Sequence, residues 1–452
     1  LSKGAGSGSM NGRMMSLVVA TCWLLNQEAE AANAVRGEAE PIPAISKAVQ
    51  VQIAPAVELL EEVVNINSGT MNHAGVRKVG EVFDRELTAI GFKTAWHSME
   101  SVNRAGHLFA EYGHGGVCQL LIGHLDTVFE KDSPFQRYSR DGNIAVGPGV
   151  NDMKGGDVVI VSALKVLKEI GALQQGRYIV ALIGDEEKSG QPKSVSRHHL
   201  IEAAKGCDVA LGFEYAAGLN AATIARRGSS GWMLEVDGVR AHSSRIFSDQ
   251  VGSGAIFEAA RILSTFHNQL SGERYLTFNP GVIIGGTEID YDPAQNAGRV
   301  FGKTNVVAQT LRVQGGLRTL SRSQELAARA RMREITSQDN LPQTTARISF
   351  TDGYPPMAPT AGNLALLEML SEASEDLGYG AVTAYDPGLR GAADVSFVAE
   401  YVDAIDGIGA EGQGAHALNE QIDLSTLPLL IERAALLMYR IARQDAWPKN
   451  SH

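Results

Sequence analysis

Three short apolar runs, each followed at once by acidic or imidazole side chains, limit most strongly what this chain can fold into. The runs are VCQLLIGHLDTV at 117–128, RYIVALIGDEE at 177–187 and CDVALGFE at 207–214. Their continuous apolar centres are typical of strands that are buried on both faces. A helix-like segment, DVVIVSALKVLKEIGAL, separates the first two runs. We therefore predict an α/β fold with a central, mostly parallel sheet.

The chain of 452 residues is long enough for two domains. Amphipathic helix patterns precede the three runs, over about 49–91, and return late in the chain in NLALLEMLSEASEDLG and LPLLIERAALLMYRIARQ. Between residues 226 and 352 the pattern changes to half-exposed strands with two helices, one opened by Ser321 with Gln324 as its capping-box partner. We expect a catalytic domain formed by 49–225 and 353–452, and an inserted α+β lid or dimerisation domain at 226–352.

The first 48 residues fit neither domain. Residues 1–10, LSKGAGSGSM, resemble a tag remnant. Arg13, the apolar run MMSLVVATCWLL and the small residues at 32–34 then follow the layout of a secretory signal peptide, although a short buried helix fits the same pattern. An acidic, alanine-rich linker follows. We predict export to the periplasm or the medium, and a cytoplasmic protein if the apolar run is not a signal peptide.

Charge and cysteine content narrow the classes of partner. A formal net charge of −11, without an apolar run long enough to cross a bilayer, disfavours nucleic acid and membranes as partners. The three cysteines, Cys22, Cys118 and Cys207, do not form a disulfide framework. Cys118 and Cys207 lie in apolar strand-like runs, where we expect buried free thiols, with a disulfide between them as the alternative.

Ionisable side chains gather where the predicted strands end. His124 and Asp126 follow the first run, the acidic triplet 185–187 ends the second, and Glu214 ends the third. Asp152 lies in a turn, GPGVNDMKGG, before a helix. Ligands of open α/β sheets bind beyond the carboxyl ends of the strands, and carboxylates packed there without a cation would repel one another. The pattern predicts one or two divalent cations, for which zinc is well suited and cobalt or manganese are alternatives.

The motifs HLDTV, GPGVNDMKGG, DEEKSG, GFE and a late histidine together resemble the signature of the glutamate carboxypeptidase / aminoacylase family of dizinc metallohydrolases. The resemblance extends over about residues 50–445. It implies a zinc-exopeptidase-like catalytic domain with an inserted lid. It also implies five metal ligands, with one zinc bound by His124 and Glu214, the other by Glu187 and His416, and both bridged by Asp152.

The same resemblance implies two further roles beside the metals. Asp126 would orient the imidazole of His124 and fix its tautomer. Glu186 would be the general base that takes a proton from the attacking water and passes it to the leaving amine.

The inserted segment carries three candidates for substrate recognition. His242, in VRAHS, resembles the family's G-x-x-[AG]-H-[SA] turn, whose histidine polarises the scissile carbonyl and, in dimeric members, comes from the other subunit. Asn305 and Arg318 match the pair that holds the substrate's carboxylate. Ala308, Leu317 and the loop GLRGAADVSF depart from the family's pattern, which leaves the substrate's side chain open.

These expectations combine into one function and two alternatives. We predict zinc-dependent hydrolysis of an amide bond next to a free carboxylate, of the carboxypeptidase or dipeptidase type, by a homodimer or higher homo-oligomer. Deacylation of N-acyl amino acids is the alternative that uses the same chemistry. A non-catalytic binding protein on the same fold is the remote alternative, and it is disfavoured because both Glu186 and Asp152 are present.

Overall fold

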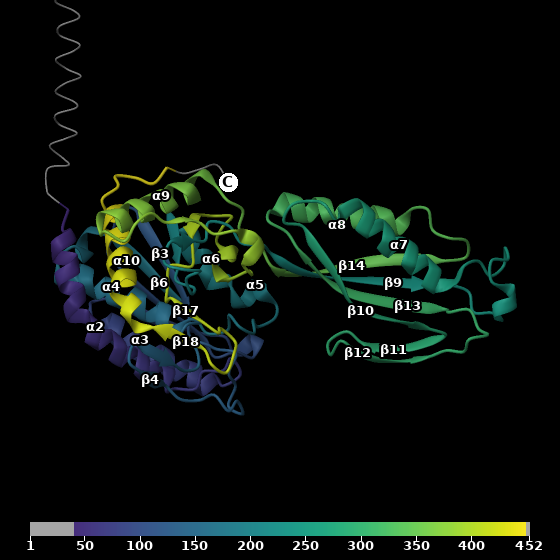
Figure 1. Cartoon of the computed structure of the whole chain (residues 1–452), viewed down its shortest axis with the longest axis horizontal. Coiled ribbons are helices and arrows are strands. Elements are labelled where there is room, and N and C mark those ends of the chain that lie inside the picture. Colours follow the sequence, from purple (N-terminus) through teal and green to yellow (C-terminus); the bar gives the residue numbers. More distant parts are fainter. Residues whose placement is uncertain (1–39, 449–452) are drawn as a thin grey trace, which may run out of the picture. The chain divides into compact units, whose positions relative to one another are not determined.

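The computed structural model describes residues 40–448, so the predicted signal peptide lies outside the described residues. A six-stranded sheet forms the centre of the catalytic part, in the order β1-β2-β6-β3-β7-β16 (Figure 1). β6, β3, β7 and β16 are mutually parallel. At one side of the sheet β2 lies between β6 and β1 and runs antiparallel to both. The strands are β1 (Lys93–Ser98), β2 (Gly106–Tyr112), β3 (Cys118–His124), β6 (Arg177–Ile183), β7 (Val209–Gly212) and β16 (Asp403–Ile405). The prediction of a mostly parallel α/β sheet is confirmed.

Helices cover both faces of this sheet. β3 is buried along its whole length, with α4 and α10 packed against it on one face. On the other face its alternate residues share a core with α6 and with the segment that begins at Asp394. The helices of this part are α2 (Ile42–Val64), α3 (His73–Ala89), α4 (Lys154–Glu169), α5 (Lys193–Ser196), α6 (His198–Lys205), α9 (Ala361–Asp376) and α10 (Leu427–Ala442). Within residues 40–448, no helix has the length and apolar character needed to span a bilayer.

Two small sheets lie outside the central one. The first has the order β17-β18-β5-β4, and the second pairs β15 with β8. Their strands are β4 (Ser139–Asp141), β5 (Ile144–Val146), β8 (Ala221–Ala222), β15 (Thr383–Ala384), β17 (Gly412–Gln413) and β18 (Gln421–Asp423). The turn between β17 and β18 carries His416, in a left-handed backbone conformation with φ of 66°.

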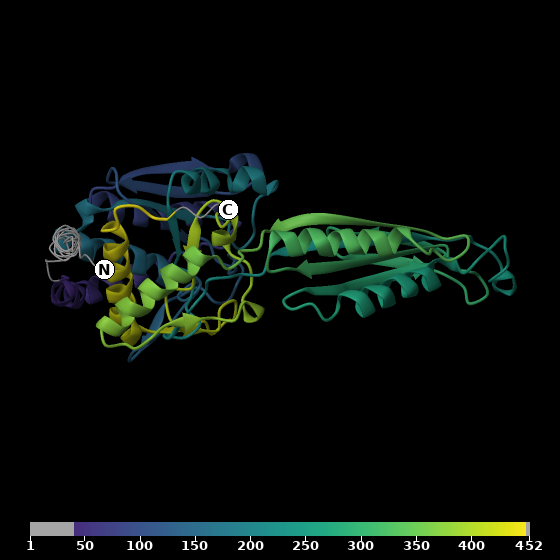
Figure 2. The ribbon, with the colours of Figure 1, turned by 90° about the horizontal axis from the view of Figure 1, so that it is seen from above.

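The inserted segment forms a separate antiparallel sheet in the order β10-β13-β9-β14. Helices α7 and α8 lie on one face of it (Figures 1 and 2) and bury a core around Trp232 and Phe266. Ser321 caps α8 as predicted, by accepting from the Gln324 N–H at 3.1 Å. The elements are β9 (Ser229–Asp237), α7 (Gly254–Leu270), β10 (Thr277–Gly286), the hairpin of β11 (Glu288–Asp292) and β12 (Ala297–Phe301), β13 (Thr310–Arg318), α8 (Arg322–Ser337) and β14 (Thr345–Tyr354).

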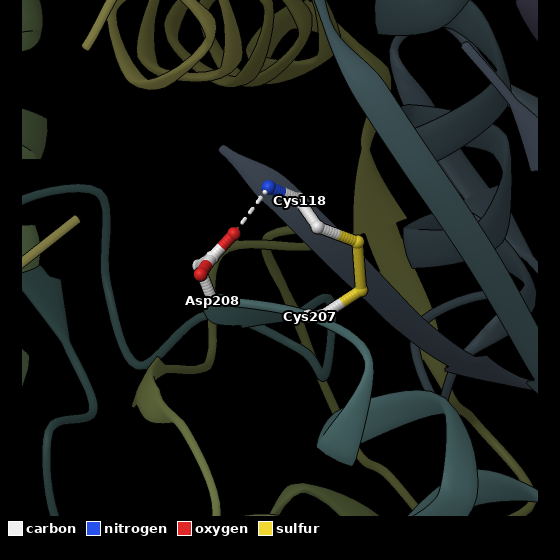
Figure 3. The surroundings of a disulfide bond; sticks show 3 residues. All are labelled: Cys118, Cys207 and Asp208. Atoms are coloured by element: carbon white, nitrogen blue, oxygen red, sulfur yellow. Dashed lines mark hydrogen bonds between the residues drawn. A yellow bond between two sulfur atoms is a disulfide. The ribbon is translucent and has the colours of Figure 1, made fainter. Parts of the chain in front are cut away.

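Cys118 and Cys207 form a disulfide (Figure 3), so the expectation of free thiols was wrong. β3 begins at Cys118, and its parallel neighbour β7 follows Cys207 closely, which brings the two Cα atoms to 4.6 Å. That separation lies within the range that a disulfide spans. Asp208 also accepts a hydrogen bond from the Cys118 N–H at 2.8 Å. The pairing follows from strand order, which the apolar pattern around each cysteine does not reveal.

Candidate metal centre

The carboxyl ends of three neighbouring parallel strands bring the predicted ligands to one edge of the central sheet. β3 ends at His124, which lies opposite Ile183 of β6. On the other side of β3, Ile122 lies opposite Gly212 of β7. The acidic residues that follow β6 and β7 therefore emerge beside His124; they are Glu186, Glu187 and Glu214.

Asp152 lies between two histidines and presents one carboxylate oxygen to each. Its Oδ1 is 3.2 Å from Nε2 of His124, and its Oδ2 is 3.2 Å from Nε2 of His416. Oε1 of Glu214 is 3.7 Å from the same nitrogen of His124. Oε2 of Glu187 is 3.2 Å from Nε2 of His416. The five side chains thus form two His–Glu pairs that share one aspartate.

The residues present fit a divalent cation. Ligand atoms of His124, Asp152 and Glu187 all lie within 4.8 Å of one another. Oε1 of Glu187 is buried and accepts no hydrogen bond from any described residue. Burial and the nearby Asp152 carboxylate raise the pKa of Glu214 to about 8, while hydrogen bonds to Asp152 and Glu187 raise the pKa of His416 to about 11. A cation would accept lone pairs from this crowded set and relieve the repulsion among its carboxylates.

The turn that carries Asp152 is fixed by a buried acid that the sequence analysis did not single out. Glu420 accepts hydrogen bonds from the main-chain N–H groups of Gly149, Asn151 and Asp152, at 3.1, 2.7 and 2.8 Å. Burial raises the pKa of Glu420 to about 7. The available signal was its place four residues after His416.

Asp126 contacts the main chain of the two glutamates more closely than it contacts the imidazole. Nδ1 of His124 is 3.0 Å from the Asp126 carbonyl oxygen and 3.6 Å from Oδ1 of its carboxylate. The carboxylate accepts hydrogen bonds from Thr70 Oγ1 at 2.6 Å and from the N–H groups of Glu186 and Glu187 at 3.0 and 3.2 Å. Burial raises its pKa to about 7. The main chain therefore orients His124, and the Asp126 carboxylate holds the turn after β6.

Glu186 is partly buried beside these ligands, and its carboxylate has no hydrogen-bond partner in the described part of the chain. Burial raises the pKa of this carboxyl group well above its usual value, against the opposing effect of His124. A carboxylate with a raised pKa that is not bonded to protein is suited to exchange a proton with water.

A buried ion-pair network lies behind the glutamate turn. Arg197 donates to Asp185 Oδ1 at 2.5 Å and to Asp394 Oδ1 at 2.6 Å. Asp394, together with His124 and Glu214, lines a cavity of about 10 Å³, which is room for one water molecule. The loop that carries Asp394 departs from the family's pattern, but the network is not visible in the sequence because its partners come from distant segments.

The three recognition candidates lie in the inserted segment and are exposed; Arg318 is on β13, and His242 and Asn305 are in loops. His242 and Asn305 are neighbours, since His242 bridges to Val306 and the Asn305 carbonyl accepts from the Ser243 N–H at 2.9 Å. Arg318 ends β13, so the length of that strand, about 25 Å, separates it from the end near Asn305. One chain therefore does not bring Asn305 and Arg318 together.

Comparison with known proteins agrees with this geometry. Residues 120–440 match the model described as Peptidase family M20/M25/M40. Carboxypeptidase G2 of Pseudomonas sp. (strain RS-16) is 28% identical over 393 residues, which cover 85% of this chain and 89% of the relative. Succinyl-diaminopimelate desuccinylase of Methylocella silvestris is 30% identical over 200 residues, 41% of this chain and 50% of the relative.

The fold is also shared with solved structures. Aminopeptidase PepT of Bacillus cereus superposes with a TM-score of 0.68 at 18% sequence identity, and the match covers 86% of this chain and 99% of the other. The family model spans most of the chain and includes the strands that carry the candidate metal centre. This chain belongs to peptidase family M20/M25/M40, and it is an enzyme of the metallopeptidase class.

Proposed function

We propose that this protein hydrolyses an amide bond next to a free carboxylate, as a carboxypeptidase or dipeptidase that uses two zinc ions. The observation that carries the proposal is Asp152, whose two carboxylate oxygens each face a separate His–Glu pair at 3.2 Å from the imidazole. That arrangement suits one aspartate bridging two cations, with zinc favoured by the mixture of imidazole and carboxylate ligands. Cobalt and manganese are the alternative metals.

Each ligand has a defined part in this proposal. His124 and Glu214 would hold one zinc, Glu187 and His416 the other, and Asp152 both. Bound zinc would polarise the scissile carbonyl and make water a stronger acid. Glu186 takes a proton from the attacking water and delivers it to the leaving nitrogen, because its carboxylate has no hydrogen-bond partner among the described residues and the residue directly precedes the ligand Glu187.

The inserted sheet would recognise the substrate, as a lid and as a dimerisation domain formed by 226–352. Arg318 would bind the substrate's carboxylate, since a guanidinium pairs well with it. His242 would stabilise the negative charge that develops on the scissile carbonyl oxygen. Arg318 ends β13, and Asn305 lies beyond the other end of that strand. We therefore propose that His242 and Asn305 contact the substrate in the site of the partner subunit of a homodimer.

Deacylation of N-acyl amino acids is the second candidate function. The desuccinylase relative, 30% identical over 200 residues, favours it, because that enzyme's name denotes removal of an acyl group. The two functions share every proposed catalytic group and the recognised carboxylate of the released amino acid, and they differ in the acyl group on the other side of the amide bond.

We further propose that the protein is exported. The Cys118–Cys207 disulfide supports this, because such bonds persist in oxidising compartments and are rare in the cytosol. The signal peptide predicted from the sequence agrees with it.

A substrate screen tests the proposed function. The zinc-loaded protein is incubated with dipeptides that have a free carboxylate, with N-acetyl and N-benzoyl amino acids, and with the carboxyl-amidated counterparts of all of these. Amine release is measured. We expect turnover of members with a free carboxylate and loss of turnover after chelation, with recovery on adding zinc. Equal turnover of the amidated members would contradict carboxylate recognition, and no turnover of any member would contradict the amide-hydrolase proposal.

A further inference from the structure

Glu186 is held through its main chain. Asp126 Oδ1 accepts a hydrogen bond from the Glu186 N–H at 3.0 Å. On the other side, the Tyr354 hydroxyl donates to the Glu186 carbonyl oxygen at 2.7 Å. Its carboxylate has no protein partner among the described residues, so the direction of that side chain depends on how firmly these two contacts hold the backbone.

Tyr354 comes from a different part of the fold. It is the last residue of β14, the strand by which the chain leaves the inserted sheet. Three residues later, Met357 exchanges main-chain hydrogen bonds of 2.9 and 3.0 Å with Arg226, where the chain enters that sheet. Tyr354 thus belongs to the inserted sheet at its junction with the catalytic part, while its hydroxyl reaches the turn after β6.

The hydrogen bonds of Tyr354 are fully assigned by counting protons. A phenol has one proton, and that proton goes to the Glu186 carbonyl, which can only accept. Ser189 Oγ, at 2.7 Å, and Arg197 Nη2, at 3.0 Å, must therefore both donate to the Tyr354 oxygen. The ring packs edge-on against Phe397 at 4.9 Å between centroids. Three hydrogen bonds fix the position of the hydroxyl, and through one of them it holds the Glu186 carbonyl in place.

We propose that Tyr354 is a positioning residue for Glu186, through which the end of the inserted sheet fixes the backbone of the catalytic base. The inference rests on the proposed role of Glu186. Arg197 supports the contact, because Asp185 and Asp394 anchor its guanidinium beneath the tyrosine. A general base that is displaced by a fraction of an ångström loses much of its effect, whereas substrate and metal contacts made elsewhere are unaffected.

The first test is Tyr354→Phe, which keeps the ring and removes the hydroxyl. With the member of the substrate screen that has the highest kcat/KM, we expect kcat to fall about tenfold, as the loss of one such hydrogen bond allows. KM should stay within about twofold and zinc content should match the unchanged protein, while Tm should fall by only a few degrees, because the hydrogen bonds of the hydroxyl are lost. Tyr379→Phe is the matched control, because it also removes a phenol hydroxyl, one that donates to Glu432 Oε2 at 2.6 Å and has no contact with Glu186; its kcat should stay close to that of the unchanged protein.

A double-mutant cycle separates this inference from the proposed function. In Glu186→Gln protein, measured at high enzyme concentration, adding Tyr354→Phe should cause no further loss if the tyrosine acts through Glu186. Equal losses in both backgrounds, an unchanged kcat in Tyr354→Phe, or a loss of activity explained by lost zinc or by unfolding at the assay temperature would overturn the inference. A normal kcat in the Glu186→Gln single variant would instead refute the proposed base, whatever Tyr354→Phe does.

Discussion

The candidate site residues of the central sheet lie close together, whereas those of the inserted segment are exposed and lie in two separate places. At the edge of the central sheet, each of two imidazole nitrogens lies 3.2 to 3.7 Å from oxygens of two carboxylates, one of which belongs to the shared Asp152. In the inserted segment, His242, Asn305 and Arg318 are exposed; Arg318 ends β13, and the other two lie in loops beyond its opposite end. The contrast suggests that one chain assembles its own metal chemistry, whereas recognition of the substrate needs a second element to complete it.

The largest effect is expected from Glu186→Gln. The amide keeps the shape and size of the side chain but cannot accept the proton of the attacking water, so kcat should fall by about a thousandfold. Zinc content by elemental analysis should stay near that of the unchanged protein, because Glu186 is not among the proposed ligands. Residual activity above a few per cent would remove Glu186 as the base, and a matching loss of zinc would move it into the ligand set.

Arg318→Ala tests recognition of the substrate's carboxylate by the inserted segment. Loss of the guanidinium should raise KM for substrates with a free carboxylate by about ten- to a hundredfold and leave kcat nearly unchanged, as expected for an interaction made equally in the ground and transition states. Arg347→Ala, at an exposed arginine of strand β14 in the same sheet, is the matched control and should change neither constant. An equal loss on carboxyl-amidated substrates would discredit the carboxylate contact.

The sequence predicted the central sheet well because its signals are local. The continuous apolar runs became β3, β6 and β7, and helix patterns became α4, α9 and α10. Two outer strands, β1 and β16, were missed because one is short and the other half-exposed, so neither carries a strong pattern. The run KTNVVAQTLRVQGGLR at 303–318 predicts a strand along its whole length, but only Thr310–Arg318 forms one.

The ligands of the candidate metal site were predictable for the same reason. The residues that hold those ligands in place were not. His124, Asp152 and Glu187 each follow or precede a recognisable element, so their meeting could be expected from strand ends alone. Glu420 and Arg197 act through main-chain and ion-pair contacts with segments far away in sequence, which no local pattern encodes. The Cys118–Cys207 pairing likewise depends on which strands are neighbours.

Mixed dimers test whether a second subunit completes recognition. His242→Ala and Glu186→Gln proteins, each inactive alone, are unfolded, mixed in equal amounts and refolded. If His242 serves the partner's site, half of the dimers are mixed and each has one intact site, so activity should recover to about a quarter of that of the unchanged protein. Absence of recovery in heterodimers purified through two different tags would contradict an exchanged histidine and favour a role within one chain.

The smallest effect on activity is expected from Cys207→Ser. This variant tests whether contacts within one chain keep the metal ligands in place without the disulfide. The disulfide closes a loop of 89 residues that contains His124, Asp152 and Glu187. Its removal should lower the free energy of unfolding by about 4 to 5 kcal/mol in the chain-entropy model, and Tm by several degrees, while kcat and KM of the folded protein stay unchanged. Cys118→Ser should match it, and adding a reductant should lower the Tm of the unchanged protein but of neither variant. A fall in kcat at temperatures where Cys207→Ser is fully folded would mean that the disulfide also sets the spacing of β3 and β7, and hence the distance between His124 and Glu214.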